Sequence, residues 1–147
     1  MSKVDYKPEG FHSVTPYLVV QGADRLIEFM KQAFGGEPGI CSRQPDGRIM
    51  HANVRIGDSM IELGEANDTW KARPTALHLH VEDVDATYRR ALEAGATSLY
   101  EPDDKPYGSR ESGVEDPSGN YWFIATHKED VSEEEFQRRM AAASQGS

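Results

Sequence analysis

Hydrophobic and polar residues alternate along several short stretches of the chain, and the clearest of these is Thr75 to Val81. Successive side chains of a strand point to opposite faces. The alternation divides the stretch into an apolar set and a set with two imidazoles: Leu77, Leu79 and Val81 against Ala76, His78 and His80. We expect the imidazole face to line a cleft, because imidazole binds metals and transfers protons near neutral pH. The alternative is the solvated face of a half-buried sheet.

The two-residue alternation of strands and the spacing of apolar residues along helices predict the other elements. Strands are expected at residues 13–20, 37–43, 48–56, 60–64, 75–81, 96–100, 110–115 and 121–126. Asp24 and Asp83 are predicted to cap two helices, and Gly35 follows the last apolar position of the first. Ser132 and Glu135 have the spacing of a capping box, which predicts a short C-terminal helix.

The order strand, helix, strand, strand, strand occurs twice. An offset of 61 residues superimposes the halves, for example Leu18 on Leu79 and Leu63 on Ile124. This repetition predicts an α+β fold of two tandem βαβββ modules in one domain, residues 1–147. The expected parts are module one at about 13–65, a connector at about 66–74, module two at about 75–127 and a C-terminal helix at about 133–142. Each sheet has one apolar face for its helix, so two modules side by side would form a cupped mixed sheet around a central cleft.

The strand faces opposite the predicted core carry a carboxylate, imidazoles, a guanidinium and aromatic rings. They comprise Thr15, Tyr17, His51, Asn53, Arg55, Met60, Glu62, Ala76, His78, His80, Tyr121 and Phe123. Polar and aromatic groups that converge in a concavity are typical of a ligand pocket. Tyr107 and Arg110 lie in a segment that would cover its opening, and we include both as candidate ligand-binding residues. Met50 is expected on the apolar face of its strand, with Ala52 and Val54.

Composition limits the classes of partner. The chain has 16 Lys and Arg against 25 Asp and Glu, a formal net charge of -9. This balance argues against nucleic acid and anionic membrane surfaces as partners, since both require basic patches. The single Cys41 excludes an internal disulfide, and no run of 18 apolar residues predicts a membrane span. We therefore expect a cytoplasmic protein with a small-molecule ligand.

Three segments resemble the vicinal oxygen chelate superfamily, which includes glyoxalase I, bleomycin and fosfomycin resistance proteins and extradiol dioxygenases. They are HANVRIGDSMIEL (51–63), LHLHVEDVDATYRRALEAGA (77–96) and GVEDPSGNYWFIATHKEDVSEEE (113–135). The chain is most similar to the small glyoxalase-like branch that is often called PhnB-like, for which EDPSGN beside an aromatic strand is the most specific signal. The resemblance covers nearly the whole chain. It implies paired βαβββ modules, a cupped sheet around the active site and a homodimer.

The resemblance also indicates where a metal would bind. In metal-dependent members, each module supplies one ligand from its first strand and one from its last. The matching positions in this chain are Thr15, Glu62, Ala76 and Phe123. Glu62 is the one good ligand among them, which argues against ordinary glyoxalase I activity. A displaced site for one divalent ion (Zn, Ni or Mn), formed by Glu62, His78 and either His51 or His80, is the alternative.

Two main functions are open at this stage. In the first, the protein is a glyoxalase-like lyase or isomerase in which Glu62 takes a proton from a carbon next to a carbonyl group. His78 or a metal would stabilise the resulting enediolate, and Arg55 would hold an anionic group. In the second, a non-catalytic protein of the bleomycin resistance type sequesters an aromatic or cationic drug or antibiotic between Tyr17, Trp70, Tyr121 and Phe123. A dimeric scaffold with an empty cleft is a third reading.

Overall fold

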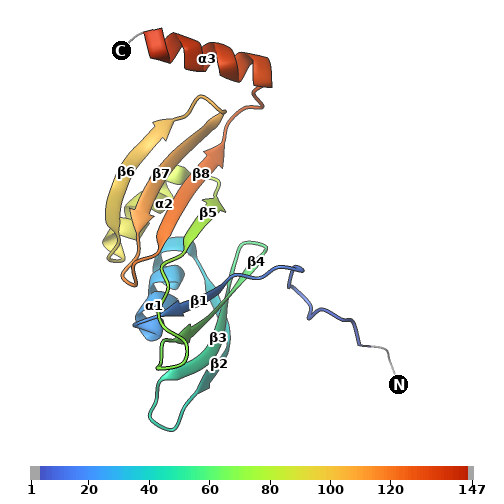
Figure 1. Cartoon of the computed structure of the whole chain (residues 1–147), viewed down its shortest axis with the longest axis vertical. Helices are drawn as coiled ribbons and strands as arrows, with labels where there is room; N and C mark the ends of the chain where they lie inside the picture. Colours follow the sequence, from blue (N-terminus) through green and yellow to red (C-terminus); the bar gives the residue numbers. More distant parts are fainter. Residues whose placement is uncertain (1–3, 146–147) are drawn as a thin grey trace.

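The computed structural model describes residues 4–145, which form two four-stranded mixed sheets and three helices (Figure 1). In chain order the elements are β1 (Tyr17–Val20), α1 (Ala23–Phe34), β2 (Glu37–Arg43), β3 (Ile49–Ile56), β4 (Ser59–Glu65), β5 (Ala76–His80), α2 (Val84–Glu93), β6 (Thr97–Asp104), β7 (Ser109–Glu115), β8 (Tyr121–His127) and α3 (Glu133–Gln145). The predicted repetition of strand, helix and three strands is confirmed. No helix within these residues is long and apolar enough to cross a lipid bilayer.

Both sheets have the same topology. Their strand orders are β1-β4-β3-β2 and β5-β8-β7-β6. In each sheet the first strand in the chain pairs in parallel with the last, β1 with β4 and β5 with β8. Leu18 lies opposite Leu63 and Leu79 lies opposite Ile124, as the offset of 61 residues requires. Helices α1 and α2 lie on the same side of the two sheets and pack against each other (Figure 1). The opposite side of each sheet, which we call its outer face, is not covered by any helix of residues 4–145.

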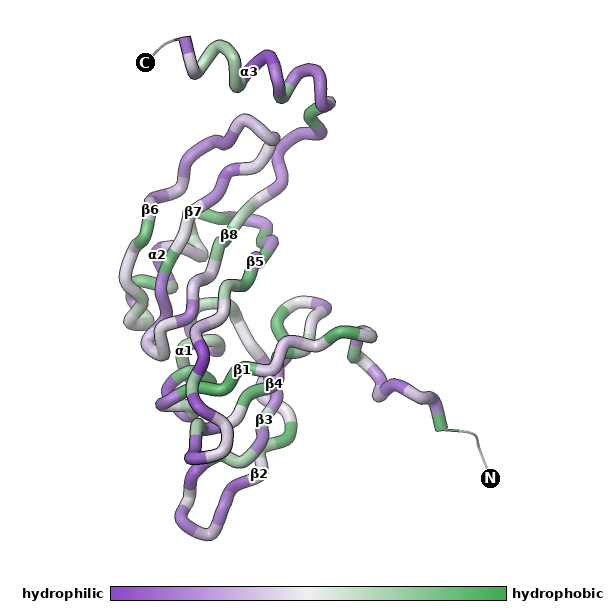
Figure 2. Tube along the Cα trace, in the orientation of Figure 1, coloured by the Kyte–Doolittle hydropathy of each residue, from purple (hydrophilic) through white to green (hydrophobic). Residues whose placement is uncertain are grey.

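The core lies between the helices and the inner faces of the sheets. The Phe34 ring at the end of α1 contacts Trp122 of β8 at a centroid distance of 4.7 Å, so aromatic packing joins the two modules. Arg90 of α2 adds a hydrogen bond to the Ala33 carbonyl at 3.4 Å. In Figure 2 the strongly hydrophobic segments include β1, whereas the β2–β3 loop is hydrophilic. The largest fully buried side chains are Trp122, Phe29, Leu18, Leu26, Met30, Ile49, Leu63, Ile124, Val20, Val54, Val84 and Val114.

The two module helices begin in different ways. Asp83 caps α2 as predicted, because its carboxylate accepts a hydrogen bond from the Ala86 amide at 3.1 Å. The predicted cap of α1 is wrong. Gly22, at a φ of 83°, precedes that helix, and the Glu65 carboxylate at the end of β4 accepts hydrogen bonds from the Gly22 and Ala23 amides, each at 2.9 Å. A carboxylate remote in sequence thus replaces Asp24, which lies in the first turn and pairs with Arg43.

Met50 does not lie in the core, contrary to the prediction. The pairing of β2 with β3 contains one extra residue of β3, because Ser42 lies opposite His51 while Arg43 lies opposite Ile49. Such a bulge reverses the alternation of faces. Ile49 is therefore buried, at 2% exposure, and Met50 turns to the outer face, at 55% exposure.

The EDPSGN turn is held by one buried carboxylate. Asp116 is 3% exposed. It accepts hydrogen bonds from the Ser118 amide at 2.8 Å, from the Asn120 amide at 3.0 Å and from the Trp122 indole at 2.8 Å. The Asn120 side-chain oxygen in turn accepts from the Thr75 amide at 3.0 Å, which fixes the chain just before β5. The motif therefore stabilises module two and places β5.

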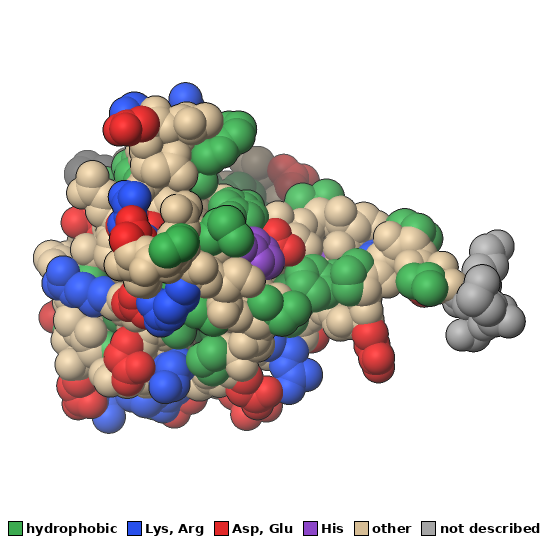
Figure 3. Space-filling view, turned by 90° about the horizontal axis from the view of Figure 1, so that it is seen from below, with side chains coloured by type: hydrophobic (Ala, Val, Ile, Leu, Met, Phe, Trp, Pro, Cys, Tyr) green, Lys and Arg blue, Asp and Glu red, His purple; other side chains and the backbone are tan. Residues whose placement is uncertain are grey.

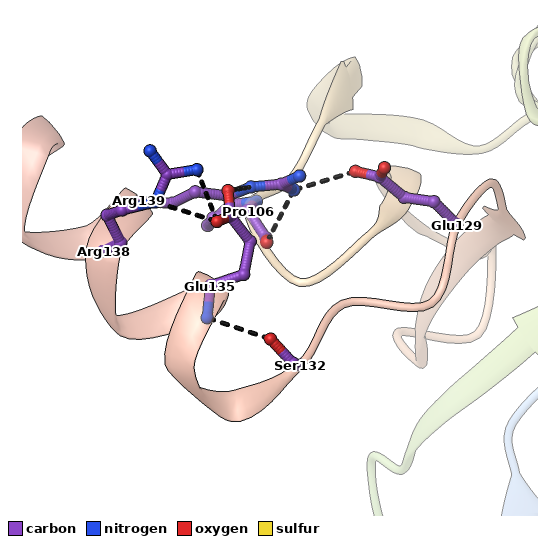
Figure 4. A network of polar contacts seen from close by, with 6 residues as sticks. All are labelled: Pro106, Glu129, Ser132, Glu135, Arg138 and Arg139. Carbon is purple, nitrogen blue, oxygen red and sulfur yellow. Dashed lines mark hydrogen bonds and ion pairs between the residues drawn. The ribbon is translucent and has the colours of Figure 1, made fainter.

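Helix α3 projects from the second sheet and is held by polar contacts (Figure 4). The Ser132 hydroxyl accepts from the Glu135 amide at 3.1 Å, which confirms one half of the predicted capping box. The reciprocal half is absent from the described contacts, because the Glu135 carboxylate pairs with Arg138 and Arg139 instead. Arg139 also binds Glu129 at 2.8 Å and donates to the carbonyl of Pro106, which joins α3 to the β6–β7 hairpin.

We predict that Asp116→Ala destabilises the protein by about 3 kcal/mol, because four donors lose their acceptor: the part-buried Ser118 amide and the buried Asn120 backbone amide, Asn120 side-chain amide and Trp122 indole. Urea unfolding followed by circular dichroism would measure this loss. Glu115→Ala is the matched control on the neighbouring residue, whose side chain makes no hydrogen bond with residues 4–145, and should change stability by no more than about 0.5 kcal/mol. Equal stability of the two variants would contradict the structural role of Asp116.

Candidate functional site

The outer faces of the two sheets carry different chemistry on an equivalent framework. Strand pairing defines one row of facing residues in each sheet: Tyr17, Glu62 and Asn53 in module one, and His78, Phe123 and Gly113 in module two. Asn53 and Gly113 are therefore equivalent. His51, two residues before Asn53, corresponds to Glu111, two residues before Gly113.

On the outer face of module one, an aromatic ring, an imidazole and a carboxylate lie together. The Tyr17 and His51 rings stack at a centroid distance of 5.8 Å and an interplanar angle of 23°. The His51 Nε2 atom lies 3.7 Å from a Glu62 carboxylate oxygen, and the Glu62 side chain is 27% exposed. Burial, and then the negative charge of Glu62, raise the pKa of the Tyr17 phenol. This side of the site can offer a ligand a ring to stack on and a carboxylate.

Asn53 and Arg55 are engaged by β2. The buried Asn53 amide oxygen accepts a hydrogen bond from the Ile40 amide at 3.1 Å, at the irregularity between Pro38 and Cys41. Arg55 pairs with Glu37 at 2.7 Å, and both side chains are exposed. These contacts give both side chains a structural partner, and their ligand-binding roles stay predictions.

A hollow of about 430 Å³ lies at one end of the module-one face. We call it the tryptophan hollow, and its lining residues are Tyr17, Val19, Met50, Gly64, Glu65, Asn67 and Trp70. Gly64 is required in its floor, since a Cβ there would lie 2.9 Å from the Tyr17 hydroxyl and 2.7 Å from the Met50 carbonyl oxygen. The outward turn of Met50 supplies an apolar wall.

Trp70 is held over this hollow by its own loop. Its side chain is among the most exposed large apolar ones, at 67%. The Asn67 side-chain oxygen accepts hydrogen bonds from the Thr69 amide at 2.9 Å and the Trp70 amide at 2.7 Å, and the Asn67 amide donates to the Trp70 carbonyl at 2.9 Å. This Asx-type turn fixes the loop without a ligand. Sequence reasoning named Trp70 but missed Met50, Gly64 and Asn67.

The outer face of module two centres on Glu111, which sequence reasoning missed. Its side chain is 12% exposed, and one of its oxygens, Oε1, lies 3.5 Å from the His78 Nε2 atom. The Tyr107 hydroxyl donates to the same oxygen at 2.8 Å, and the Tyr100 hydroxyl donates to Oε2. We call these four residues the Glu111 cluster. The signal that could have located it is the alternation of β7, which puts Glu111 and Gly113 on one face.

Gly113 makes room for Tyr100 in this cluster. A Cβ at Gly113 would lie 2.5 Å from the Tyr100 ring, so the ring lies against the backbone of β7. On the ring, Lys105 Nζ lies 4.9 Å from the centroid. Burial, followed by the hydrogen bond and charge of Glu111, raises the pKa of Tyr107 to about 12, and the same causes raise the pKa of Tyr100 further. Both phenols therefore stay protonated to a higher pH than an ordinary tyrosine does.

The other predicted residues of module two divide between the outer face and the helix side. The His78 and His80 rings lie 4.6 Å apart, and the Tyr121 and Phe123 rings 6.4 Å apart. Arg110 instead pairs with Asp85 of α2 at 2.9 Å. Its ligand-binding role stays a prediction.

A second hollow, of about 280 Å³, lies between the modules. We call it the inter-module hollow. Its lining is mostly apolar and comes from the segment before β1, the β3–β4 hairpin and β5, and it includes Thr15, Ala76 and His78. In Figure 3 apolar side chains gather around an exposed histidine between the body and the N-terminal arm.

The donor set does not fit the metal site that the superfamily implies. Thr15, Ala76 and Phe123 occupy three of the four usual positions, and alanine and phenylalanine have no ligand atom. The displaced alternative of Glu62, His78 and either His51 or His80 is not assembled within residues 4–145. Among residues 4–145, no three His, Cys, Asp or Glu side chains are arranged to hold a metal ion. We therefore derive no step through a metal.

The fold and the two outer faces define a paired βαβββ protein with ligand-sized hollows. A family model, the Glyoxalase/Bleomycin resistance protein/Dioxygenase superfamily, matches residues 10–124, so the chain belongs to that superfamily. An uncharacterized protein of Mycobacterium tuberculosis is 32% identical over 150 residues, with 91% of this chain and 85% of the relative covered. An uncharacterized protein of Mycobacterium bovis has the same identity, with 95% of the relative covered.

Solved structures share the fold. TioX from Micromonospora sp. ML1 has a TM-score of 0.64 at 22% identity, covering 78% of this chain and 99% of that one. A PhnB protein from Bacillus cereus has a TM-score of 0.64 at 18% identity, with the same two coverages. A glyoxalase/bleomycin resistance protein/dioxygenase family enzyme from Burkholderia phytofirmans PsJN has a TM-score of 0.64 at 18% identity, covering 80% and 97%. At these identities the likeness is one of fold.

We predict that Glu111→Gln lowers the pKa of Tyr107 from about 12 toward its ordinary value near 10. Removing the carboxylate charge makes the phenolate less unfavourable, while burial of the ring keeps part of the shift. The ultraviolet absorbance of tyrosinate, followed against pH, measures the change. Glu115→Gln, on the same face of β7, is the control and should leave the titration unchanged. An identical titration of Glu111→Gln and the wild type would contradict the geometry of the cluster.

Proposed function

We propose that the protein is a glyoxalase-like small-molecule binder that takes a planar aromatic compound into the tryptophan hollow. The observation that carries this proposal is that the side chains of Trp70, Tyr17 and Met50 are exposed around the hollow without a ligand, and that Gly64 forms its floor. A drug or antibiotic of this shape would be sequestered without turnover, as in the bleomycin resistance type of protein.

The energetics support a stacked ligand. Exposed large apolar side chains that cluster mark binding surfaces on soluble proteins. Aromatic stacking contributes about 0.5–1.5 kcal/mol per pair beyond the area buried. The Asn67 turn fixes the Trp70 backbone before binding, so less conformational entropy is lost when a ligand enters.

A lyase or isomerase is the second candidate function. One observation favours it: each outer face pairs an imidazole with a carboxylate, His51 with Glu62 at 3.7 Å and His78 with Glu111 at 3.5 Å. Such pairs transfer protons in general acid–base catalysis. The candidate needs no metal, which agrees with a donor set that lacks three of the four usual ligands.

We further propose a homodimer. Within one chain, the helices hold the modules together and leave both outer faces without a covering element. Exposed Tyr17 and Trp70 lie on or beside one face and exposed Tyr107 and Tyr121 on or beside the other, and clustered exposed apolar side chains mark interaction surfaces. A second copy that faces these surfaces would enclose the cleft on both sides.

Binding is tested by titrating the protein with planar quinoline and naphthalene compounds while the tryptophan fluorescence is measured. Trp122 is fully buried, so quenching of the exposed emission reports Trp70. Tyr17→Ala should weaken binding about tenfold, because one wall of the hollow is lost. Leu99→Ala, an exposed apolar residue of β6 outside the hollow, is the matched control and should bind as the wild type does. Unquenched Trp70 with every compound would overturn the proposal.

The dimer is tested by sedimentation velocity. We expect twice the chain mass of 16.4 kDa at micromolar concentration. Tyr121→Glu should shift the distribution toward the monomer, because a charge would then replace the aromatic ring beside Phe123 on the outer face. A wild-type protein that sediments as a monomer would refute the dimer and leave the tryptophan hollow unaffected.

A further inference from the structure

We propose that Met50 is a site of reversible oxidation that regulates the tryptophan hollow. A hydroperoxide converts the Met50 thioether to the sulfoxide, and the polar wall that results lowers the affinity of the hollow for planar aromatic compounds. The regulated site is that of the proposed function, on which this inference therefore rests. Two observations carry it: Met50 is turned outward from the core, and its side chain lines the hollow.

The methionines of residues 4–145 differ in how far an oxidant can reach them. Met50 is 55% exposed and Met140, on α3, is 45% exposed, whereas Met30 is 0% exposed in the core. Met60 is half-buried. Because oxidation of a thioether follows its exposure, a peroxide attacks Met50 and Met140 first in the folded protein. Of these two, Met50 lines the tryptophan hollow.

The outward position of Met50 is fixed by its strand. The bulge between β2 and β3 gives the core position to Ile49, which is 2% exposed. The Met50 carbonyl oxygen would lie 2.7 Å from a Cβ at Gly64, so the Met50 backbone packs against the floor of the hollow. The Met50 side chain cannot enter the core without displacing this backbone. It therefore stays in the wall of the hollow after oxidation.

Oxidation changes the wall from apolar to polar. A thioether is flexible and polarisable, which suits contact with an aromatic ring. A sulfoxide is a polar group whose oxygen accepts hydrogen bonds from water. A planar aromatic ligand that packs on this oxygen removes the water and offers no donor in its place, which is unfavourable. The ligand should therefore bind less tightly to the oxidised protein.

The fold should tolerate the change at Met50. The added oxygen lies on an exposed outer face, where water can solvate it. The same oxygen on Met30 would lie in the core among buried apolar side chains, without water. Oxidation confined to the exposed methionines is thus expected to change the affinity of the hollow and to leave the stability of the protein unchanged.

The step is a two-electron oxygen transfer from the hydroperoxide. With hydrogen peroxide, a lone pair of the Met50 Sδ atom attacks one oxygen, an S–O bond forms and the O–O bond breaks. The proton on the transferred oxygen passes to the departing hydroxide, which leaves as water. The sulfur is oxidised and the peroxide is reduced. Methionine sulfoxide reductases reverse the change at the expense of a thiol, which returns the thioether.

The experiment uses the full-length chain with Cys41→Ser as the parent protein, because the exposed Cys41 thiol also reacts with peroxide. The parent is treated with hydrogen peroxide, and catalase then removes the excess. Peptide mass spectrometry measures the sulfoxide at each methionine, and calorimetry measures the binding of isoquinoline, a planar aromatic probe. We expect sulfoxide at Met50 and Met140 but not at Met30, and a Kd for isoquinoline that rises about tenfold. The two stereospecific sulfoxide reductases together should restore the original Kd.

Two variants assign the effect to Met50. Met50→Leu keeps an apolar wall without a reactive sulfur, so its Kd before and after peroxide should be equal. Met140→Leu is the matched control, because it removes the other exposed methionine, and its Kd should rise as that of the parent does. Circular dichroism verifies that both variants fold, and the melting temperature of the parent should not change on oxidation. An equal rise in Kd in Met50→Leu, or a fall in melting temperature that accompanies the rise, would overturn the inference.

The remaining outcomes separate this inference from the proposed function. Isoquinoline that binds equally well before and after complete oxidation of Met50 would refute the regulation and leave the binding function in place. Met50 that stays unmodified while Met140 is oxidised would also refute the regulation alone. A protein that does not bind isoquinoline before oxidation would refute the binding function for this probe, and the regulation with it.

Discussion

The parallel pairing of the first strand with the last in each module is the constraint on which the rest of the structure depends. It fixes which residues share a face, because each row across the sheet begins on β1 or β5 and continues through β4 or β8. The leucine and valine residues at alternate positions of each strand pack against α1 and α2. The residues between them then lie on the outer faces, which no helix of residues 4–145 covers. The position of the candidate chemistry is therefore a consequence of how the core is formed.

Glycines within the strands give the outer faces their shape. Gly64 leaves space for the Tyr17 hydroxyl and Gly113 leaves space for the Tyr100 ring, where a Cβ would approach within 3 Å. A glycine in a strand costs stability, since it adds chain entropy to the unfolded state and contributes no packing. In both places the space is filled by a phenol that lines a hollow or holds a carboxylate. This is what we expect where a backbone is shaped for a side chain with a functional role.

Much of the fold could be predicted from local pattern. The bounds of β2 are those predicted, and the Asp83 cap is confirmed, because alternation and capping depend on neighbours in the sequence. The errors lie where distant residues compete. Glu65 replaces Asp24 at the start of α1, and a bulge turns Met50 outward. Neither event leaves a local signal, since a bulge depends on the partner strand and a remote cap on the tertiary fold.

The candidate site was harder to predict for the same reason. Glu111 reads locally as one more acid on a polar strand, and its significance arises only when β6 and the loop after it bring two phenols to its carboxylate. The predicted metal set stays a prediction: His51 and Glu62 share the first sheet and His78 belongs to the second, and residues 4–145 do not bring the three together. The residue types on each strand can be read from the sequence, whereas the groups they form depend on the register between strands.

The duplicated framework explains how two kinds of chemistry arose on one fold. Equivalent positions hold Tyr17 and His51 in module one and His78 and Glu111 in module two, so the imidazole has changed strand between the copies. On β1 the first residue of the row is the phenol Tyr17, and on β5 it is the imidazole His78. Both strands lie at an edge of their sheets in residues 4–145, and the side chains of each row project from the sheet plane onto the outer face. Because these side chains lie on the outer face and are partly exposed, substitution there changes the chemistry of that face without disturbing the buried side chains that hold the module together.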